Sequence, residues 1–329
     1  MPQKKTALIF LLLSTISIHF AFSQKISEVD KIVAKYPKSF SSTEKLADRI
    51  QDDFKSDGDK ARAIFSWIAF NIKYDYNAYL NPPRVQGFSY SSEAEKERKI
   101  QERNNKLIQK AFNSKKAVCE GFTALYQHLA ESVGLKCEII RGDSKISLRD
   151  IGRKNTSSNH AWNTVLIDKR WRLIDVTWGQ GYYDTSKGRM VNEFAPIYFD
   201  TDPDYFFAKH FPDSGSYLGT QLNKEEFLNG PLIYNKTIEN DYKIKSPESG
   251  IIEARNGEKL TFEIKNVSKS NQVFYVNKKN QAVKVLNPKE KRGGLEFQIP
   301  YDNNIGEYIT IFIDTNSIVS YKVIPKERI

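Results

Sequence analysis

The stretch Ala117-Val-Cys-Glu-Gly-Phe-Thr-Ala-Leu-Tyr126 places a cysteine at the start of an apolar run that is typical of a helix. Two later segments hold the other groups that a thiol nucleophile needs, Asn159-His-Ala-Trp-Asn163 and Trp171-Arg-Leu-Ile-Asp-Val-Thr-Trp178. A histidine takes the thiol proton, and an aspartate orients the histidine. The order cysteine, histidine, aspartate therefore guides the interpretation of the whole chain.

Cys119 is the candidate nucleophile. Only the thiolate attacks a carbonyl, and with an ordinary pKa of about 8.5 little of it forms at neutral pH. A helix that begins at Cys119 would stabilise the anion with the positive end of its dipole, and His160 would take the proton. We therefore expect these two side chains to form an ion pair.

A hairpin would bring His160 and Asp175 together. If Asp168-Lys169 is a two-residue loop between strands 160–167 and 171–177, the two side chains are diagonal neighbours on one face. A three-residue loop would place them on opposite faces. The predicted catalytic triad is Cys119, His160 and Asp175, although each residue alone is compatible with a structural role in packing or capping.

The two cysteines have different predicted roles. An exported chain that needs disulfides for stability usually carries more cysteines, in even sets. A bridge between Cys119 and Cys137 would also consume the nucleophile. We therefore expect Cys119 to be a free thiol and Cys137 to be a small apolar residue on a buried strand.

The first residues are typical of a signal peptide. Lys4 and Lys5 precede an apolar run that ends at Phe22, and cleavage is expected after Ser23. A membrane anchor is the alternative, but a transmembrane helix needs about 20 consecutive apolar residues, and this run is interrupted by polar ones. We predict a secreted or periplasmic protein with no stable membrane insertion after cleavage.

The net charge of +10 falls by two when Lys4 and Lys5 are removed. This surplus favours acidic partners such as membranes or cell-wall polymers, and it is also an ordinary means of keeping a protein soluble. Much of it lies in a predicted helix within residues 91–116, which has few aromatic residues and no nucleic-acid motif. We interpret this helix as a solvated border of the active site and expect no nucleic-acid partner.

The hydrophobic pattern of the sequence changes from helical to strand-like near residue 241. Helices are expected at 26–36, 43–54 and 57–72, and the segments after 240 alternate apolar and polar residues between turn-forming residues. Short strands of this kind predict a β-sandwich of about 90 residues. Strands are expected at 259–265, 272–276, 295–299 and 307–313.

Taken together, the motifs around Cys119, His160 and Asp175 resemble those of the transglutaminase-like superfamily, whose core is related to papain. The segments Lys60–Asp75 and Asp200–Pro212 resemble the kyphoscoliosis peptidase branch of that superfamily, in which a β-sandwich can follow the core. The resemblance implies an α+β fold with a papain/transglutaminase-like core and a C-terminal all-β immunoglobulin-like sandwich. The expected organisation is a signal peptide at 1–23, a transglutaminase-like domain at 24–240 and a β-sandwich domain at 241–329.

By the same resemblance, Cys119 is the nucleophile, His160 the general base and acid, and Asp175 the orienting residue. The backbone N–H of Cys119 would be one oxyanion donor, with Tyr74 or Trp67 as a second. Trp162 and Trp178 flank the triad as either substrate-lining or packing residues.

No metal or other cofactor is expected. His210 lacks companions at ligand spacing and is assigned a structural role. The segment Asp200-Thr-Asp-Pro-Asp204 has Tyr205 where a calcium loop needs a glycine.

The sequence thus predicts an exported cysteine hydrolase that cleaves peptide or amide bonds through a thioacyl-enzyme. Its partner would be a protein or peptide substrate, with cell-surface material as a further possibility. One alternative is a protein-crosslinking transglutaminase, in which a lysine amine replaces water as the acceptor. The other is a catalytically silent binding scaffold.

Overall fold

The computed structural model describes residues 26–82, 89–154, 158–184, 187–213 and 223–326. The predicted signal peptide at 1–23 lies outside these ranges. Within them, every helix is too short or too polar to cross a membrane.

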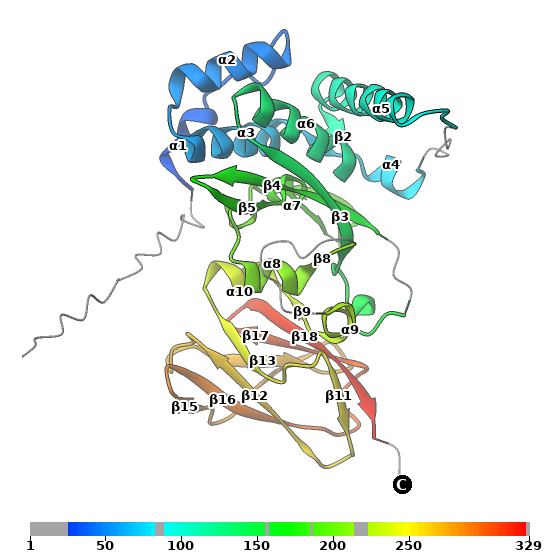
Figure 1. Ribbon diagram of the computed structural model, residues 1–329. Coiled ribbons are helices and arrows are strands. Elements are labelled where there is room, and N and C mark those ends of the chain that lie inside the picture. Colours follow the sequence, from blue (N-terminus) through cyan, green and yellow to red (C-terminus); the bar gives the residue numbers. More distant parts are fainter. Residues whose placement is uncertain (1–25, 83–88, 155–157, 185–186, 214–222, 327–329) are drawn as a thin grey trace, which may run out of the picture.

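A layer of helices covers one face of a four-stranded sheet (Figure 1). The core of this layer is α3, which begins after Ser56, a residue whose side chain accepts from the Asp59 N–H. Its Trp67 and Ile68 are completely buried, so its apolar residues stabilise the layer by burial. The helices are α1 (Glu28–Val33), α2 (Thr43–Asp53), α3 (Asp57–Asn71), α5 (Glu93–Ser114) and α6 (Cys119–Ser132). The three predicted helices at 26–36, 43–54 and 57–72 are confirmed within a few residues.

The sheet beneath these helices has the strand order β5-β4-β3-β8, with antiparallel neighbours. The strands are β3 (Cys137–Ser144), β4 (His160–Ile167), β5 (Arg170–Ile174) and β8 (His210–Pro212). Asp168 and Lys169 have φ of 49° and 62°, as a type I′ turn requires. Ile167 pairs with Arg170, which confirms the two-residue loop.

The second strand of this hairpin ends earlier than predicted. Its pairing with β4 stops at Ile174, and the expected strand at 171–177 is wrong beyond that point. The Asp175 side chain accepts from the Trp178 N–H and caps the short helix α7 (Val176–Gln180). Aspartate is a strong helix N-cap, so it ends the strand and starts the helix at the same residue.

Smaller elements border the sheet. Strands β1 and β2 pair in parallel and join the end of α3 to the start of α6. Strands β6 and β7 form an antiparallel hairpin after α7. The bounds are β1 (Lys73–Tyr74), α4 (Tyr76–Leu80), β2 (Lys116–Ala117), η1 (Leu148–Asp150), β6 (Gly181–Asp184), β7 (Arg189–Asn192), η2 (Pro196–Tyr198), α8 (Pro203–Lys209) and α9 (Lys224–Asn229).

The C-terminal region consists of two packed sheets of mainly antiparallel strands, one ordered β10-β12-β16-β15 and the other β11-β18-β17-β13-β14. Apolar side chains from both sheets form one core cluster, with Phe262 and Phe297 from one sheet and Tyr321 from the other. The strands are β10 (Lys243–Ser246), β11 (Ile251–Ala254), β12 (Lys259–Lys265), β13 (Val273–Val276), β14 (Ala282–Lys284), β15 (Lys289–Lys291), β16 (Gly294–Pro300), β17 (Tyr308–Ile313) and β18 (Asn316–Pro325). The four predicted strands are confirmed.

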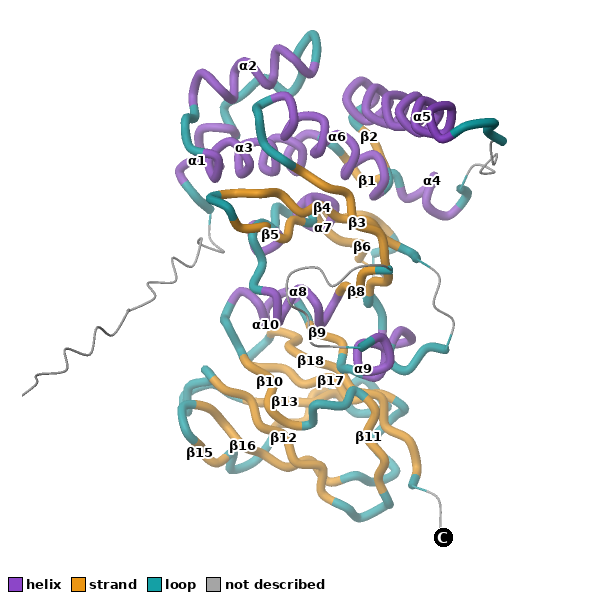
Figure 2. The backbone as a smooth tube through the Cα atoms, viewed as in Figure 1, coloured by secondary structure: helices purple, strands orange, loops and turns teal. Residues whose placement is uncertain are grey.

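Residues before position 241 also join this region. Strand β9 (Leu232–Ile233) pairs with β18, and α10 (Asn235–Glu239) contacts β18. The tube view shows α8 and α10 lying between the helix-covered sheet and the C-terminal strands (Figure 2). Short elements before residue 241 therefore connect the helix-covered sheet to the C-terminal strands.

Candidate active site

Cys119 is the first residue of α6, where the helix geometry favours a negative charge. The capping position, Val118, offers no side-chain acceptor. The first N–H groups of a helix have no acceptor within the helix, so they present partial positive charge to the Cys119 thiol. Gly121 allows this turn to pack closely, because a Cβ there would lie 2.8 Å from the Ala117 Cβ.

The α6 helix is fixed on both sides. Phe122, Leu125 and Leu129 are buried in the helical core. On the outer side, Arg103 of α5 donates to both oxygens of Glu120 at 3.0 and 2.9 Å. The partly exposed Cys119 thus stands on a helix that has little freedom to move.

His160 and Asp175 are in direct contact. The Nε2 atom of His160 lies 2.7 Å from Oδ2 of Asp175, and both side chains are buried. The other carboxylate oxygen of Asp175 accepts from the Trp178 N–H at 3.0 Å. Trp178 also stacks on the His160 ring, with centroids 5.1 Å apart. The imidazole is therefore held at its edge by the carboxylate and on its face by the indole.

Electrostatics favour the charged form of His160. Burial alone would lower its pKa, but the Asp175 charge and hydrogen bond, together with interactions of Cys119, raise it to about 10. Burial alone would raise the pKa of the Asp175 carboxyl. The charges and hydrogen bonds of His160 and His210 outweigh this effect and lower that pKa. Because Nε2 of His160 is bonded to Asp175, Nδ1 is the ring nitrogen left to interact with Cys119.

The structure therefore brings Cys119, His160 and Asp175 together in one chain of interactions. A base near a thiol, oriented by a buried carboxylate, has the geometry for nucleophilic catalysis. Both cysteines are free thiols, and Cys137 is buried on β3.

The aromatic residues singled out in the sequence have different positions. Tyr74 is partly exposed and close enough to Cys119 for the two to interact electrostatically. Trp178 is partly exposed against His160, whereas Trp162 has only 1% exposure and packs against Phe206. Trp162 is thus a packing residue. Trp67 is fully buried and donates to the Pro37 carbonyl, so its proposed oxyanion role is wrong.

His210 is a site residue that the sequence interpretation missed. Its Nε2 lies 3.0 Å from the same Asp175 oxygen that contacts His160. Strand β8 places it there by pairing with β3, where Gly142 is matched with His160 on one side and Pro212 on the other. The His210-Phe-Pro motif was the available signal, but the separation of 35 residues between Asp175 and His210 hid the contact.

Among the described residues, His160, Asp175 and His210 have potential metal-ligating atoms within 4.8 Å of one another. The N–O distances of 2.7 and 3.0 Å are also those of ordinary hydrogen bonds. An Nε2 that donates a proton to the carboxylate has no lone pair to offer a cation. We therefore interpret the three residues as a hydrogen-bonded cluster.

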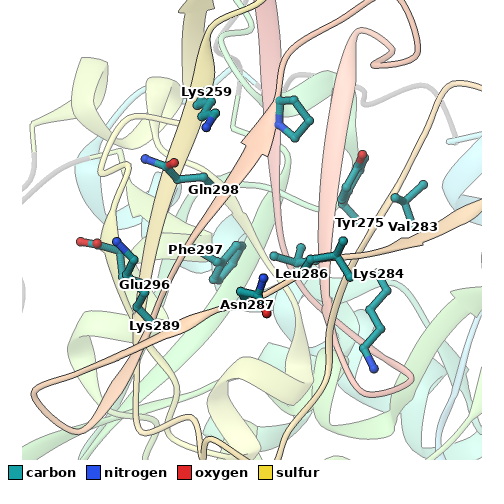
Figure 3. Close-up of a pocket in the computed structure, with 12 residues that line it drawn as sticks. Lys259, Tyr275, Val283, Lys284, Leu286, Asn287, Lys289, Glu296, Phe297 and Gln298 are labelled. Carbon is teal, nitrogen blue, oxygen red and sulfur yellow. The ribbon is translucent and has the colours of Figure 1, made fainter.

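A separate groove of about 440 Å³ lies on the C-terminal sheets (Figure 3). Its lining includes Lys259, Lys284 and Lys289 as well as the apolar Leu286 and Phe297. These residues come from strands β12, β14, β15 and β16 and the segment after β14, all outside the sheet that contains His160. The groove is therefore a different surface from the one around Cys119.

Comparison with known proteins identifies one matching family. Residues 44–176 match the transglutaminase-like superfamily. Kyphoscoliosis peptidase of Mus musculus is 26% identical over 244 residues, which cover 73% of this chain and 34% of that protein. The Homo sapiens protein is 26% identical over 261 residues, covering 78% and 36%. The chain thus spans about a third of the length of these relatives.

Hillarin of Drosophila melanogaster is 25% identical over 198 residues, covering 54% of this chain and 21% of that protein. Among solved structures, a TGase aligns with a TM-score of 0.27 and 19% identity over 46% of this chain and 34% of that one. An N-arylamine acetyltransferase variant of Mycobacterium smegmatis aligns with a TM-score of 0.30 and 10% identity, covering 78% and 70%.

Proposed function

Because the chain belongs to the transglutaminase-like superfamily, we propose that it is a cysteine hydrolase that cleaves peptide or amide bonds through a thioacyl-enzyme. The observation that supports this proposal most strongly is the position of His160, which interacts with Cys119 on one side and Asp175 on the other. This arrangement places a base beside the thiol, and a carboxylate that orients the base, before any substrate binds.

In the first half-reaction the Cys119 thiolate attacks the substrate carbonyl and a C–S bond forms. The imidazolium of His160 donates its proton to the nitrogen of the leaving amine as the C–N bond breaks. In the second half-reaction His160 takes a proton from water, the hydroxide oxygen attacks the thioester, and the C–S bond breaks. The carboxylic acid departs and the thiolate–imidazolium pair is restored.

The oxyanion formed in both steps needs hydrogen-bond donors. We assign one to the backbone N–H of Cys119, which lies at the partly exposed start of α6. The second is the hydroxyl of Tyr74. Burial first, and then the nearby Cys119, raise the pKa of Tyr74, so its phenol keeps its proton and can donate.

We further propose that the protein acts outside the cytoplasm after removal of residues 1–23. Support comes from the basic and apolar character of that segment. The two packed C-terminal sheets would form an immunoglobulin-like domain at 241–329. In this proposal the domain assists attachment to substrate or to cell-surface material, and the lysines of its groove suit an anionic surface.

One experiment distinguishes hydrolysis from crosslinking and from binding alone. The full chain and its C119A and C137A variants are incubated with a broad peptide library, and separately with casein and a biotinylated primary amine. Hydrolysis predicts new cleavage products, or glutamine converted to glutamate in the library peptides, with the parent and C137A, and none with C119A. Incorporation of the amine without hydrolysis would instead identify a crosslinking enzyme, and no turnover by the parent would favour a scaffold.

A further inference from the structure

Two histidines share one oxygen of a buried carboxylate. Oδ2 of Asp175 lies 2.7 Å from Nε2 of His160 and 3.0 Å from Nε2 of His210. Asp175 and His210 are completely buried. Since Oδ1 accepts from the Trp178 N–H, three donors converge on this carboxylate from β4, β8 and α7.

The proton of His210 must be divided between two acceptors. Its Nδ1 lies 3.1 Å from the Phe206 carbonyl oxygen, and its Nε2 faces Asp175. Burial, opposed by the Asp175 hydrogen bond, lowers the pKa of His210 to about 4, so at neutral pH the ring has one N–H. A hydrogen bond to a charged acceptor is roughly twice as strong as one to a neutral acceptor. The N–H therefore belongs on Nε2, directed at Asp175.

The His210 ring has little freedom to turn away from this oxygen. Phe206 stacks on it with centroids 4.0 Å apart, and Trp178 lies 4.3 Å away. The edge contact with Trp162 is 5.0 Å between centroids. The ring is thus packed as tightly as a core residue while its polar edge points into the reaction centre.

We propose that His210 is a positioning residue, whose Nε2–H holds the Asp175 carboxylate in the orientation that serves His160 and limits how strongly that carboxylate binds the imidazolium. This inference rests on the proposed function, because it takes Cys119 and His160 as the reacting pair. His210 acts through Asp175 and touches neither the thiol nor the substrate.

The sharing of Oδ2 has a consequence for proton transfer. A general acid and base works best when its pKa is near the working pH, and an imidazolium bound too strongly by its carboxylate gives up its proton slowly. Because the two donors compete for Oδ2, removing His210 strengthens the His160–Asp175 bond and raises the pKa of His160. The other ionisable groups in this neighbourhood are Cys119 of α6, Lys209 of α8, Tyr74 of β1 and Tyr198 of η2.

Lys209 acts on the same carboxylate but is held independently of His210. Its Nζ donates to the Ile233 carbonyl at 3.1 Å and lies 4.9 Å from the Trp178 ring centroid. The His210 side chain takes part in neither contact. A change in the His160 pKa then reports the lost His210 donor.

The test is nitrogen NMR on protein labelled in its four histidines, using the parent chain and the variants H210F and H210Q. In the parent, the His210 proton should reside on Nε2. In H210F, the pKa of His160 should rise by about half a unit to one unit, and hydrolysis of p-nitrophenyl acetate at pH 7 should slow roughly tenfold with KM unchanged. H210Q retains an N–H donor and should restore most of the rate and the parent pKa.

A proton on Nδ1 of His210 in the parent would overturn the proposal, as would an unchanged His160 titration in folded H210F. If H210F does not fold, the His210 tautomer in the parent still decides the question. Iodoacetamide labelling of Cys119 in the parent and in H160A separately tests the proposed function. Equal labelling rates in the two would overturn that function while the histidine tautomers could still be measured.

Discussion

Cys119 and Cys137 are the same residue type in opposite surroundings. Cys119 begins α6, is partly exposed and interacts with His160. Cys137 lies on β3 with 4% exposure, its sulfur 3.6 Å from the Asn163 amide, and burial raises the pKa of its thiol. The comparison teaches that a cysteine becomes a nucleophile through a helix start and a charged base, whereas an apolar strand keeps it a neutral thiol.

The strongest way to break the comparison is to remove each cysteine in turn with a pair of alanine variants. C119A should lower turnover on the order of 10⁵-fold, because the covalent intermediate cannot form. C137A removes a buried sulfur outside the reaction chain and should keep turnover within about twofold of the parent. Both are measured as kcat on any substrate found in the library, with melting temperature as the control for folding. Equal losses in the two variants would contradict the contrast.

A second prediction concerns Asp175, which acts on Cys119 through His160. D175N removes the charge that supports the His160 imidazolium, so the pKa of His160 should fall and turnover should drop roughly 10³- to 10⁴-fold. The iodoacetamide reaction of Cys119 at pH 6 should slow as well, since less thiolate is present. Turnover within tenfold of the parent would show that Asp175 does not orient His160.

The elements that local sequence patterns determine could be predicted, whereas contacts that need distant segments to pair could not. Strand β4 and helix α6 follow from local patterns, since the strand bounds at His160–Ile167 and the helix start at Cys119 agree with the sequence interpretation. The contact of His210 with Asp175 depends on β8 joining the edge of β3, a pairing between distant segments that no local pattern encodes. A capping role was open for Asp175, but the sequence pattern placed this residue inside a strand that in fact ends at Ile174.

A third prediction concerns the pH dependence of turnover. The imidazolium of His160 is required for proton donation, and its pKa is raised to about 10 by Asp175 and Cys119 acting against burial. Turnover should therefore persist through pH 9 and decline as the pH rises through about 10, with roughly a tenfold loss for each further unit. A pH–rate profile measured with intact protein checks this. An alkaline limb near 7 would mean that Asp175 does not support the imidazolium in solution.

The smallest expected effect is that of metal removal. If His160, Asp175 and His210 are joined by hydrogen bonds, dialysis against EDTA or 1,10-phenanthroline should change turnover by less than about twofold. Metal content by mass spectrometry of the untreated protein is the companion measurement. Loss of activity on chelation and its return with added zinc would instead make the cluster a metal site.

The most direct measurement of the central claim is the site of acylation. The full chain is mixed with p-nitrophenyl acetate, quenched in acid within the first turnover and digested, and the acetylated peptide is identified by mass spectrometry. We predict a single acetyl thioester on the peptide that contains Cys119, present in C137A and absent in C119A. An acetyl group on Cys137, or none on Cys119 while the ester is being hydrolysed, would contradict the account.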